Sequence, residues 1–194
     1  TVTLWDARSL EKKHELKGHR AYVTAVAFSA NGKWLATASE DESVRIWNLS
    51  SARPKALVVI EHQYPVMSVA FSPDSKTLAT ASGDDTRVTR PGIVKLFDVE
   101  FGKELKKLEN HKKVATGVAY SPDGSRLVST SLDETVNVYD ANSGKALGFF
   151  GGHSRPTNCA VFAPDGQTVV SGSGGRAVGK NEVKFWDLAT GDEW

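Results

Sequence analysis

Histidine, hydroxyl and carboxylate side chains recur along this chain in an arrangement that could do hydrolytic chemistry. Four histidines, His19, His62, His111 and His153, are separated by 43, 49 and 42 residues, and serine, threonine and aspartate recur between them. A histidine base, a hydroxyl nucleophile and an orienting carboxylate make up the catalytic triad of hydrolases. A triad occurs once in an enzyme, whereas this set repeats, so we expect no catalytic residues and no enzyme activity.

The same histidines are the side chains best suited to bind a metal ion. Residues that recur once per structural unit lie around a ring and do not converge within the ~2 Å ligand distances of one ion. Cys159 is the only cysteine, which excludes an internal disulfide and every multi-cysteine zinc site. We therefore expect no metal and no cofactor, and we predict that Cys159 is a small core residue.

One glycine-rich segment is similar to a phosphate-binding loop. Residues 174–181 contain two glycines and Lys180 at the spacing that such a loop requires. The next residue is Asn181, however, where the loop needs a serine or threonine whose hydroxyl reaches Mg²⁺. The following segment, Val183–Trp186, is typical of a strand, whereas a phosphate loop leads into a helix. We predict a lengthened loop between two strands that binds no nucleotide.

A repeat positions all of these residues. An aromatic residue followed by Asp or Asn occurs five times, at intervals of 42, 50, 42 and 47 residues. These pairs are Trp5-Asp6, Trp47-Asn48, Phe97-Asp98, Tyr139-Asp140 and Trp186-Asp187. Between them, short apolar segments alternate with turn sequences rich in Pro, Asp and Gly, and no stretch has the periodicity of a helix. The interval is typical of a four-stranded propeller blade.

Two units carry both ends of a known signature. They contain Gly18-His19 with Trp47, and Gly152-His153 with Trp186-Asp187. On these residues, and on the partial copies between them, the chain resembles the WD-repeat β-propeller family throughout its length. The resemblance implies an all-β fold, a β-propeller of four-stranded antiparallel blades, with about four blades per chain.

The repeat also predicts how the chain is divided. We expect a single propeller array over residues 1–194, with no linker between its units. The units are a partial one at 1–18, full repeats at 19–61, 62–110 and 111–152, and a repeat lacking most of its outer strand at 153–194.

The resemblance further implies a structural polar network in each blade. A histidine precedes the innermost strand, a serine or threonine lies on the second strand, an aspartate follows in the next turn, and an aromatic residue ends the third strand. Such buried groups must hydrogen-bond to one another or lose solvation energy. The matching residues are His19, Thr37, Asp41 and Trp47; His62, Thr80, Asp84 and Phe97; His111, Ser129, Asp133 and Tyr139; and His153, Ser171 and Trp186.

Two repeats depart from this pattern. Phe97 stands where the indole donor would be, and Gly175 stands where the last repeat would have its aspartate. We therefore expect the corner of the last blade to be held less tightly than that of the first. Removal of His153 should then cost less stability than removal of His19.

Two loops of one type are longer than their counterparts. Between the aspartate position and the aromatic residue, the second and fourth repeats carry insertions of 7 and 5 residues. Both insertions are basic, with Arg87 and Arg90 in one and Arg176 and Lys180 in the other. The resemblance places these loops on the face that usually receives partners, and binding residues concentrate in loops on rigid scaffolds. Neutral variation stays the alternative, because surface loops tolerate insertions at little cost.

Composition limits the classes of function. The chain has 24 Lys and Arg against 23 Asp and Glu, a balance that argues against nucleic-acid or anionic-membrane binding. No apolar run approaches the roughly 18 residues of a membrane span, so we expect a soluble, cytoplasmic protein. We predict a non-catalytic scaffold for a protein or peptide partner. The alternatives are an accessory module or fragment of a larger enzymatic or signalling protein, and, as a minor one, anionic-ligand binding through the basic loops.

The strand count raises the question of ring closure. We expect two strands, three full blades and three final strands, which would leave a monomer with exposed apolar faces and unpaired edges. Two chains would close an eight-bladed ring as a homodimer, with the strand at 10–16 of one completing the last blade of the other. The rival is a longer polypeptide that carries the remaining blades itself.

Overall fold

The computed structural model describes residues 1–84, 90–175 and 180–194, and these residues form strands and turns without a helix. The strands group into five antiparallel sheets. We call β1–β2 the N-terminal sheet, β3–β6 blade 1, β7–β10 blade 2, β11–β14 blade 3 and β15–β17 blade 4.

The bounds of the strands are β1 Val2–Trp5, β2 Lys12–Leu16, β3 Val23–Phe28, β4 Trp34–Ser39, β5 Ser43–Asn48, β6 Ala56–Glu61, β7 Val66–Phe71, β8 Thr77–Ser82, β9 Ile93–Asp98, β10 Glu104–Leu108, β11 Ala115–Tyr120, β12 Arg126–Ser131, β13 Val136–Asp140, β14 Ala146–Phe150, β15 Thr157–Phe162, β16 Thr168–Ser173 and β17 Glu182–Asp187.

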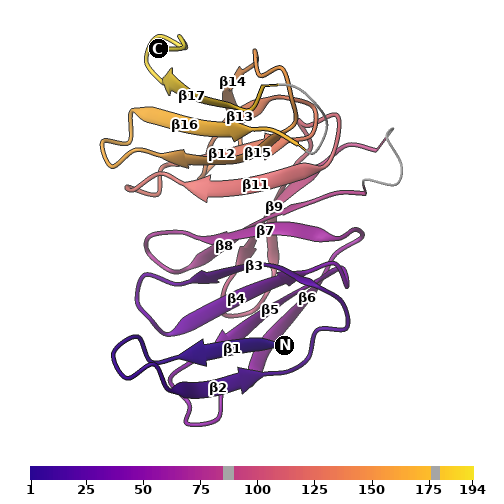
Figure 1. Cartoon of the computed structure of the whole chain (residues 1–194), viewed down its shortest axis with the longest axis vertical. Coiled ribbons are helices and arrows are strands. Elements are labelled where there is room, and N and C mark those ends of the chain that lie inside the picture. The colour runs from indigo at the N-terminus through magenta and orange to yellow at the C-terminus, as the bar shows by residue number, and fades with distance from the viewer. Residues whose placement is uncertain (85–89, 176–179) are drawn as a thin grey trace.

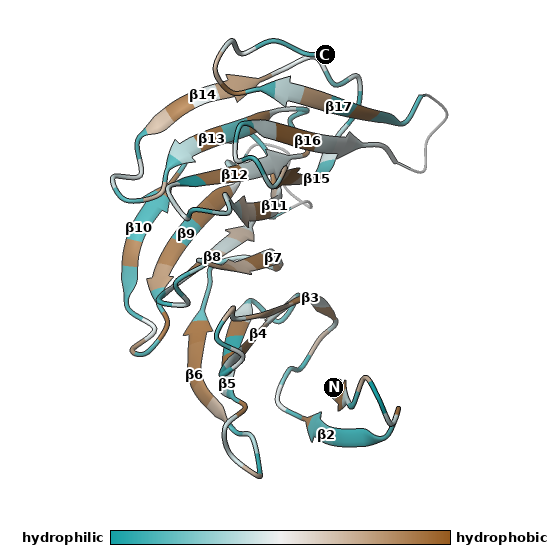
Figure 2. Ribbon diagram, turned by 90° about the vertical axis from the view of Figure 1, so that its left-hand side faces the viewer, coloured by the Kyte–Doolittle hydropathy of each residue, from teal (hydrophilic) through white to brown (hydrophobic). Residues whose placement is uncertain are grey.

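The sheets follow one another along the long axis of the molecule, from the N-terminal sheet at one end to blade 4 at the other (Figure 1). The first strands, β3, β7 and β11, lie toward one side, and the fourth strands, β6, β10 and β14, lie along the other (Figure 2). The two ends of the array lie far apart in both views.

The hydrophobic core lies between neighbouring sheets. Blade 1 contributes Val44 and Ile46 to a cluster that also contains Val69 and Leu78 of blade 2, all of them buried. Equivalent clusters lie between blades 2 and 3 and between blades 3 and 4. Alternation along each strand places one set of side chains toward the preceding blade and the other toward the next. Each sheet is therefore stabilised by its neighbours, at ~25 cal/mol per Å² of apolar surface removed from water.

Blade 2 lies tightly against blade 3 at the base of the longer loop between β8 and β9. A Cβ atom on Gly92 would lie 2.2 Å from the carbonyl oxygen of Lys113, and one on Gly83 would lie 2.7 Å from the Cα of Val114. Only glycine allows this contact. Both ends of the loop are consequently fixed against blade 3.

No helix in the described part of the chain has the length and apolar character needed to cross a membrane.

Candidate functional site

The polar network of blade 1 joins all four of its sequence-predicted residues. His19 Nε2 lies 2.7 Å from Thr37 Oγ1, and His19 Nδ1 lies 3.0 Å from Asp41 Oδ2. Trp47 Nε1 donates to Thr37 Oγ1 over 3.0 Å. The Thr37 hydroxyl therefore bridges the imidazole and the indole inside the sheet, where it has no exposed surface.

Asp41 connects the histidine to the neighbouring turn. Its carboxylate accepts hydrogen bonds from the Ser43 hydroxyl at 2.6 Å and from the Arg20 N–H at 2.8 Å. Burial alone would raise the pKa of Asp41, but the hydrogen bonds from Ser43, Arg20 and His19 outweigh it, and the pKa lies well below its usual range. The carboxylate is thus held in its charged form at the corner of the blade.

Blade 3 repeats this arrangement without an indole. His111 Nε2 lies 2.7 Å from Ser129 Oγ, and His111 Nδ1 lies 3.3 Å from Asp133 Oδ2. Tyr139 fills the aromatic position and is fully buried, and burial raises its pKa. The hydrogen-bonded chain in blade 3 lacks the indole, but its histidine contacts a hydroxyl and a carboxylate as in blade 1.

Blade 4 differs from the sequence expectation at its acidic position. Glu182, the first residue of β17, supplies the carboxylate that Gly175 cannot: its Oε2 lies 3.3 Å from His153 Nδ1. His153 Nε2 contacts Ser171 Oγ at 2.6 Å, and Trp186 Nε1 donates to the same oxygen over 2.7 Å. A longer side chain that enters from the strand therefore takes the place of the turn aspartate, which the sequence analysis did not identify.

The Glu182 carboxylate also fixes the adjoining loop. It accepts hydrogen bonds from the Ser154 N–H at 3.1 Å and the Ser154 hydroxyl at 2.9 Å. These bonds lower the pKa of Glu182 to about 2. Burial lowers the pKa of His153, and Glu182 partly counteracts that shift. Glu182 thus does in blade 4 what Asp41 does in blade 1.

Blade 2 differs from the other three blades in the contacts of its histidine and of its second-strand hydroxyl. His62 Nε2 and Thr80 Oγ1 are buried and have no hydrogen-bond partner among the described residues. The His62 ring meets Phe97 edge to face, with centroids 5.4 Å apart, where blades 1 and 4 have an indole. Burial, and then the nearby charge of Lys95, lower the pKa of His62 to about 4. The expected link between His62 and Thr80 is therefore missing.

The two basic insertions are only partly within the described residues. Arg87 and Arg176 fall outside them. Arg90 is half-buried and donates a hydrogen bond from Nη1 to the Tyr64 hydroxyl over 2.6 Å. Lys180 is exposed at the start of β17. One predicted binding cation is thus anchored to the loop before β7, and another points to solvent.

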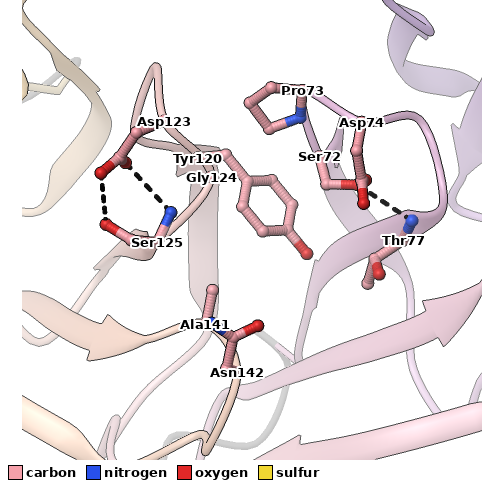
Figure 3. Close-up of a pocket in the computed structure, with 10 residues that line it drawn as sticks. All are labelled: Ser72, Pro73, Asp74, Thr77, Tyr120, Asp123, Gly124, Ser125, Ala141 and Asn142. Atoms are coloured by element: carbon pink, nitrogen blue, oxygen red, sulfur yellow. Dashed lines mark hydrogen bonds between the residues drawn. The ribbon is translucent and has the colours of Figure 1, made fainter.

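A cavity of about 250 Å³ lies between blades 2 and 3, among their first turns (Figure 3). Asp74 and Asp123 line it, and hydrogen bonds from Ser72 and Ser121, respectively, lower the pKa of each carboxyl. The Tyr120 hydroxyl is buried beside them without a hydrogen-bond partner among the described residues. The repeat pattern does not single out this cavity. Its buried hydroxyl belongs to Tyr120, which differs by that hydroxyl alone from the phenylalanines at the same position of the other blades.

The prediction that Cys159 is a core residue is wrong. Cys159 is exposed on β15. It lies on the face of blade 4 that no further sheet covers among the described residues, beside the exposed side chain of Val161. Cys159 lies in an apolar segment, but its side chain would be buried only if a neighbouring blade covered this face.

The described residues contain no group of three or more His, Cys, Asp or Glu side chains placed to hold a metal ion. Each histidine of blades 1, 3 and 4 is instead hydrogen-bonded within its own blade.

Comparison with known families decides the classification. The family described as "WD domain, G-beta repeat" matches residues 10–48, 55–88, 102–140 and 144–187. The chain belongs to this WD-repeat family. The predicted all-β propeller architecture with about four blades is thereby confirmed.

Several individual proteins are similar to the chain. The nuclear distribution protein PAC1 of Arthroderma benhamiae is 30% identical over 142 residues, 72% of this chain and 31% of that protein. The Notchless protein homolog of Arabidopsis thaliana is 49% identical over 49 residues, 25% of this chain and 10% of that protein. The target of rapamycin complex subunit wat1 of Schizosaccharomyces pombe is 44% identical over 50 residues, 26% of this chain and 15% of that protein.

A solved structure titled "Structure of U3-55K" superimposes with a TM-score of 0.76 at 22% identity, which shows a shared fold. The match covers 92% of this chain and 53% of that one. The chain therefore spans about half of this neighbour and 10–31% of the relatives above.

The geometry of blade 4 predicts the stability of two variants. His19→Ala and His153→Ala should each lower the free energy of unfolding by roughly 1–3 kcal/mol, because each leaves a buried hydroxyl and a carboxylate short of a partner. Urea denaturation of both variants and of the parent chain measures the losses. A clearly smaller loss for His153→Ala would show that Glu182 does not replace the missing aspartate.

His62 predicts a pH dependence of stability. Its pKa is lowered from 6.5 to about 4 in the folded chain, so between these values the unfolded chain binds a proton that the folded chain does not. The contribution of neutral His62 to the free energy of unfolding should therefore be fully present above pH 6.5. It should fall as the pH drops toward 4, by roughly 3 kcal/mol. Denaturation of the parent chain and of His62→Phe across this range isolates the effect. An unchanged pH slope in the variant would refute it.

Proposed function

We propose that this chain is a non-catalytic scaffold that binds a protein or peptide through the face carrying its two longer loops. The observation that supports this most is the construction of the loop in blade 2. Its ends, Gly83 and Gly92, lie against blade 3, and Arg90 is held by Tyr64. A cation on a fixed base loses little conformational entropy when it meets a partner.

Charge on this face supports a partner with acidic groups. Lys180 is exposed, and Arg155 Nη1 lies 3.5 Å from the Cβ position of Gly175, so blade 4 adds basic side chains to those of blade 2. Net charge over the whole chain is only +1, which favours a local acidic patch on a protein over a nucleic acid. A cytoplasmic location belongs to the same proposal.

The polar sets inside the blades support the absence of catalysis. In blade 1 the Thr37 hydroxyl is shared between His19 and Trp47 and is fully buried, so no substrate reaches it. The Ser171 hydroxyl is held in the same way by His153 and Trp186. A nucleophile must instead be exposed to its substrate and free to attack.

The names of the relatives support an interaction role in general terms. One relative is a subunit of a target of rapamycin complex, and another is a nuclear distribution protein. Because the chain covers a minor part of each relative, a partner of this chain has to be identified by binding experiments on the chain itself.

The proposal predicts that the basic loops are needed for binding and not for folding. We expect the chain to capture partner proteins at physiological salt, and a variant with Ser at positions 87, 90, 176 and 180, in place of Arg87, Arg90, Arg176 and Lys180, to lose them. The melting temperature of this variant should change by a few degrees at most, because exposed charges contribute little to folding. Quantitative mass spectrometry of the captured proteins measures the loss.

A matched control changes four exposed lysines in turns of the opposite edge, Lys33, Lys76, Lys103 and Lys145, to Ser. This variant should retain the captured proteins. Equal capture by both variants would refute the proposed face. Capture of nucleic acid, or of free phosphopeptides with a steep salt dependence, would favour the anionic-ligand alternative.

A further inference from the structure

A larger cavity, of about 460 Å³, lies on the outer part of blade 3. It opens between β14 and the loop that leads into β11, and Asn137, Leu147 and Phe149 are among the residues that line it. Ligand-binding pockets have volumes of roughly 300–1,000 Å³, so the cavity is large enough for a ligand. Blade 3 is a complete four-stranded sheet that packs against blade 2 on one side and blade 4 on the other. The cavity therefore does not arise at an end of the array.

The wall that β14 gives to this cavity is apolar. Leu147 and Phe149 are 53% and 70% exposed. Edge strands are commonly protected by charged side chains, and the equivalent strand of blade 2, β10, carries Glu104, Lys106 and Lys107. No residue of β14 is charged, and the difference from the largely teal β10 is visible in Figure 2. β14 thus presents an unprotected edge and two large apolar side chains.

Asn137 is a short residue at a position where the other blades have a long one. It pairs with Ser129 of the second strand, and the same position is Arg45 in β5, Lys95 in β9 and Lys184 in β17. The side chains of both lysines lie mostly buried against their blades. An asparagine in place of these longer side chains leaves the cavity of blade 3 open.

The charge of this position has also been lost in blade 3. Lys95 binds Glu104 at 2.7 Å, and Lys184 binds Glu193 at 2.6 Å. The residue of blade 3 that corresponds to these glutamates is Ala146, which pairs with the aromatic residue of the third strand as they do. A neutral pair thus replaces an ion pair. The cavity favours an apolar group, because a charge between Asn137 and Ala146 would lose hydration without gaining a partner.

One polar atom in the cavity wall is free to bind a ligand. Asn137 is only 7% exposed, and its Nδ2 lies 3.1 Å from His111 Nδ1. Its Oδ1 accepts no hydrogen bond from any residue that the structure describes. The nearby Asp133 carboxylate is buried and already bonded to His111 and Thr135. The Asn137 oxygen is therefore the acceptor that an N–H of a ligand can reach.

The cavity adjoins the face that carries the basic loops. Lys112 is exposed and lines the cavity. Its neighbour Lys113 lies against Gly92, at the base of the longer loop of blade 2. One partner segment can consequently contact the cavity and the loop face together. The exposed ammonium group of Lys112 favours an acidic residue in that segment.

We propose that this cavity binds one large apolar side chain of an extended segment of a partner protein. The side chain lies against Leu147 and Phe149, a backbone N–H of the segment donates to Asn137 Oδ1, and an adjacent acidic residue lies beside Lys112. The segment runs along the open edge of β14, where main-chain hydrogen bonds add affinity. This inference rests on the proposed function and names the kind of segment that the partner presents.

Random linear peptides displayed on phage, selected on the 194-residue chain, test the proposal. The selected peptides should share a leucine, isoleucine or phenylalanine next to an acidic residue. Fluorescence polarisation of a synthetic peptide with the selected sequence then gives its affinity. Asn137→Lys should weaken binding roughly tenfold or more, because it brings into blade 3 the long side chain of blades 2 and 4. Phe149→Ser, at an exposed site, should have a similar effect, and circular dichroism checks that both variants are folded.

A matched pair of variants gives the control. Leu147 and Leu105 occupy the same position of β14 and β10 and are 53% and 48% exposed. Leu147→Ser should weaken binding of the peptide, whereas Leu105→Ser should leave it unchanged. Serine in place of the apolar residue of the peptide should abolish binding.

The proposal is overturned if no peptide is selected, or if Asn137→Lys binds the selected peptide as the parent chain does. The variant with serine at positions 87, 90, 176 and 180 should keep the affinity for this short peptide within a few-fold. Peptide binding that is lost in that variant but retained in Asn137→Lys would support the basic-loop face and refute the cavity. The two proposals therefore fail separately.

Discussion

The contact between the faces of neighbouring sheets is the constraint on which the rest of the structure depends. Each blade is a thin sheet with apolar residues on both sides, so it cannot bury its side chains alone. The clusters that contain Val44, Leu96 and Val136 lie between blades and not within one. The size of a side chain on one blade is thus limited by the side chains of the neighbouring blade. Small residues such as Ala36 and Ala79 therefore recur on the second strands, where the sheets pack together.

The polar network performs a different task in this arrangement. It fixes the corner where the chain leaves one blade and enters the next, through a histidine bonded to a hydroxyl on one side and a carboxylate on the other. Three blades reach the same geometry with different residues: Asp41, Asp133 or Glu182 provides the carboxylate. Blade 2 tolerates an unsatisfied His62, because its sheet contacts still hold both faces. The loops can consequently vary in length and charge while the blades stay in place.

Much of this could be predicted from the sequence, because a repeat constrains the strands and the corner residues at the same time. The periodic pairs of an aromatic residue with Asp or Asn located the third strands, and the histidines located the corners. Glu182 was missed because it approaches from a strand and compensates for an insertion, which the spacing alone does not reveal. The close approach of Gly92 to Lys113 was missed for a similar reason: it depends on the distance between blades, which no local pattern encodes. Cys159 was misassigned because its burial depends on a neighbouring blade.

Native-state hydrogen exchange tests the central claim, that contact between sheets and not pairing within a sheet stabilises the chain. The amides of β8, β9, β12 and β13, whose sheets have a neighbour on both faces, should exchange most slowly, at rates set by global unfolding. The amides of β1, which is paired with β2 but has a neighbouring sheet on one face only, should exchange many times faster. Equal protection of β1 and of the central strands would contradict the claim and assign the stability to hydrogen bonds within each sheet.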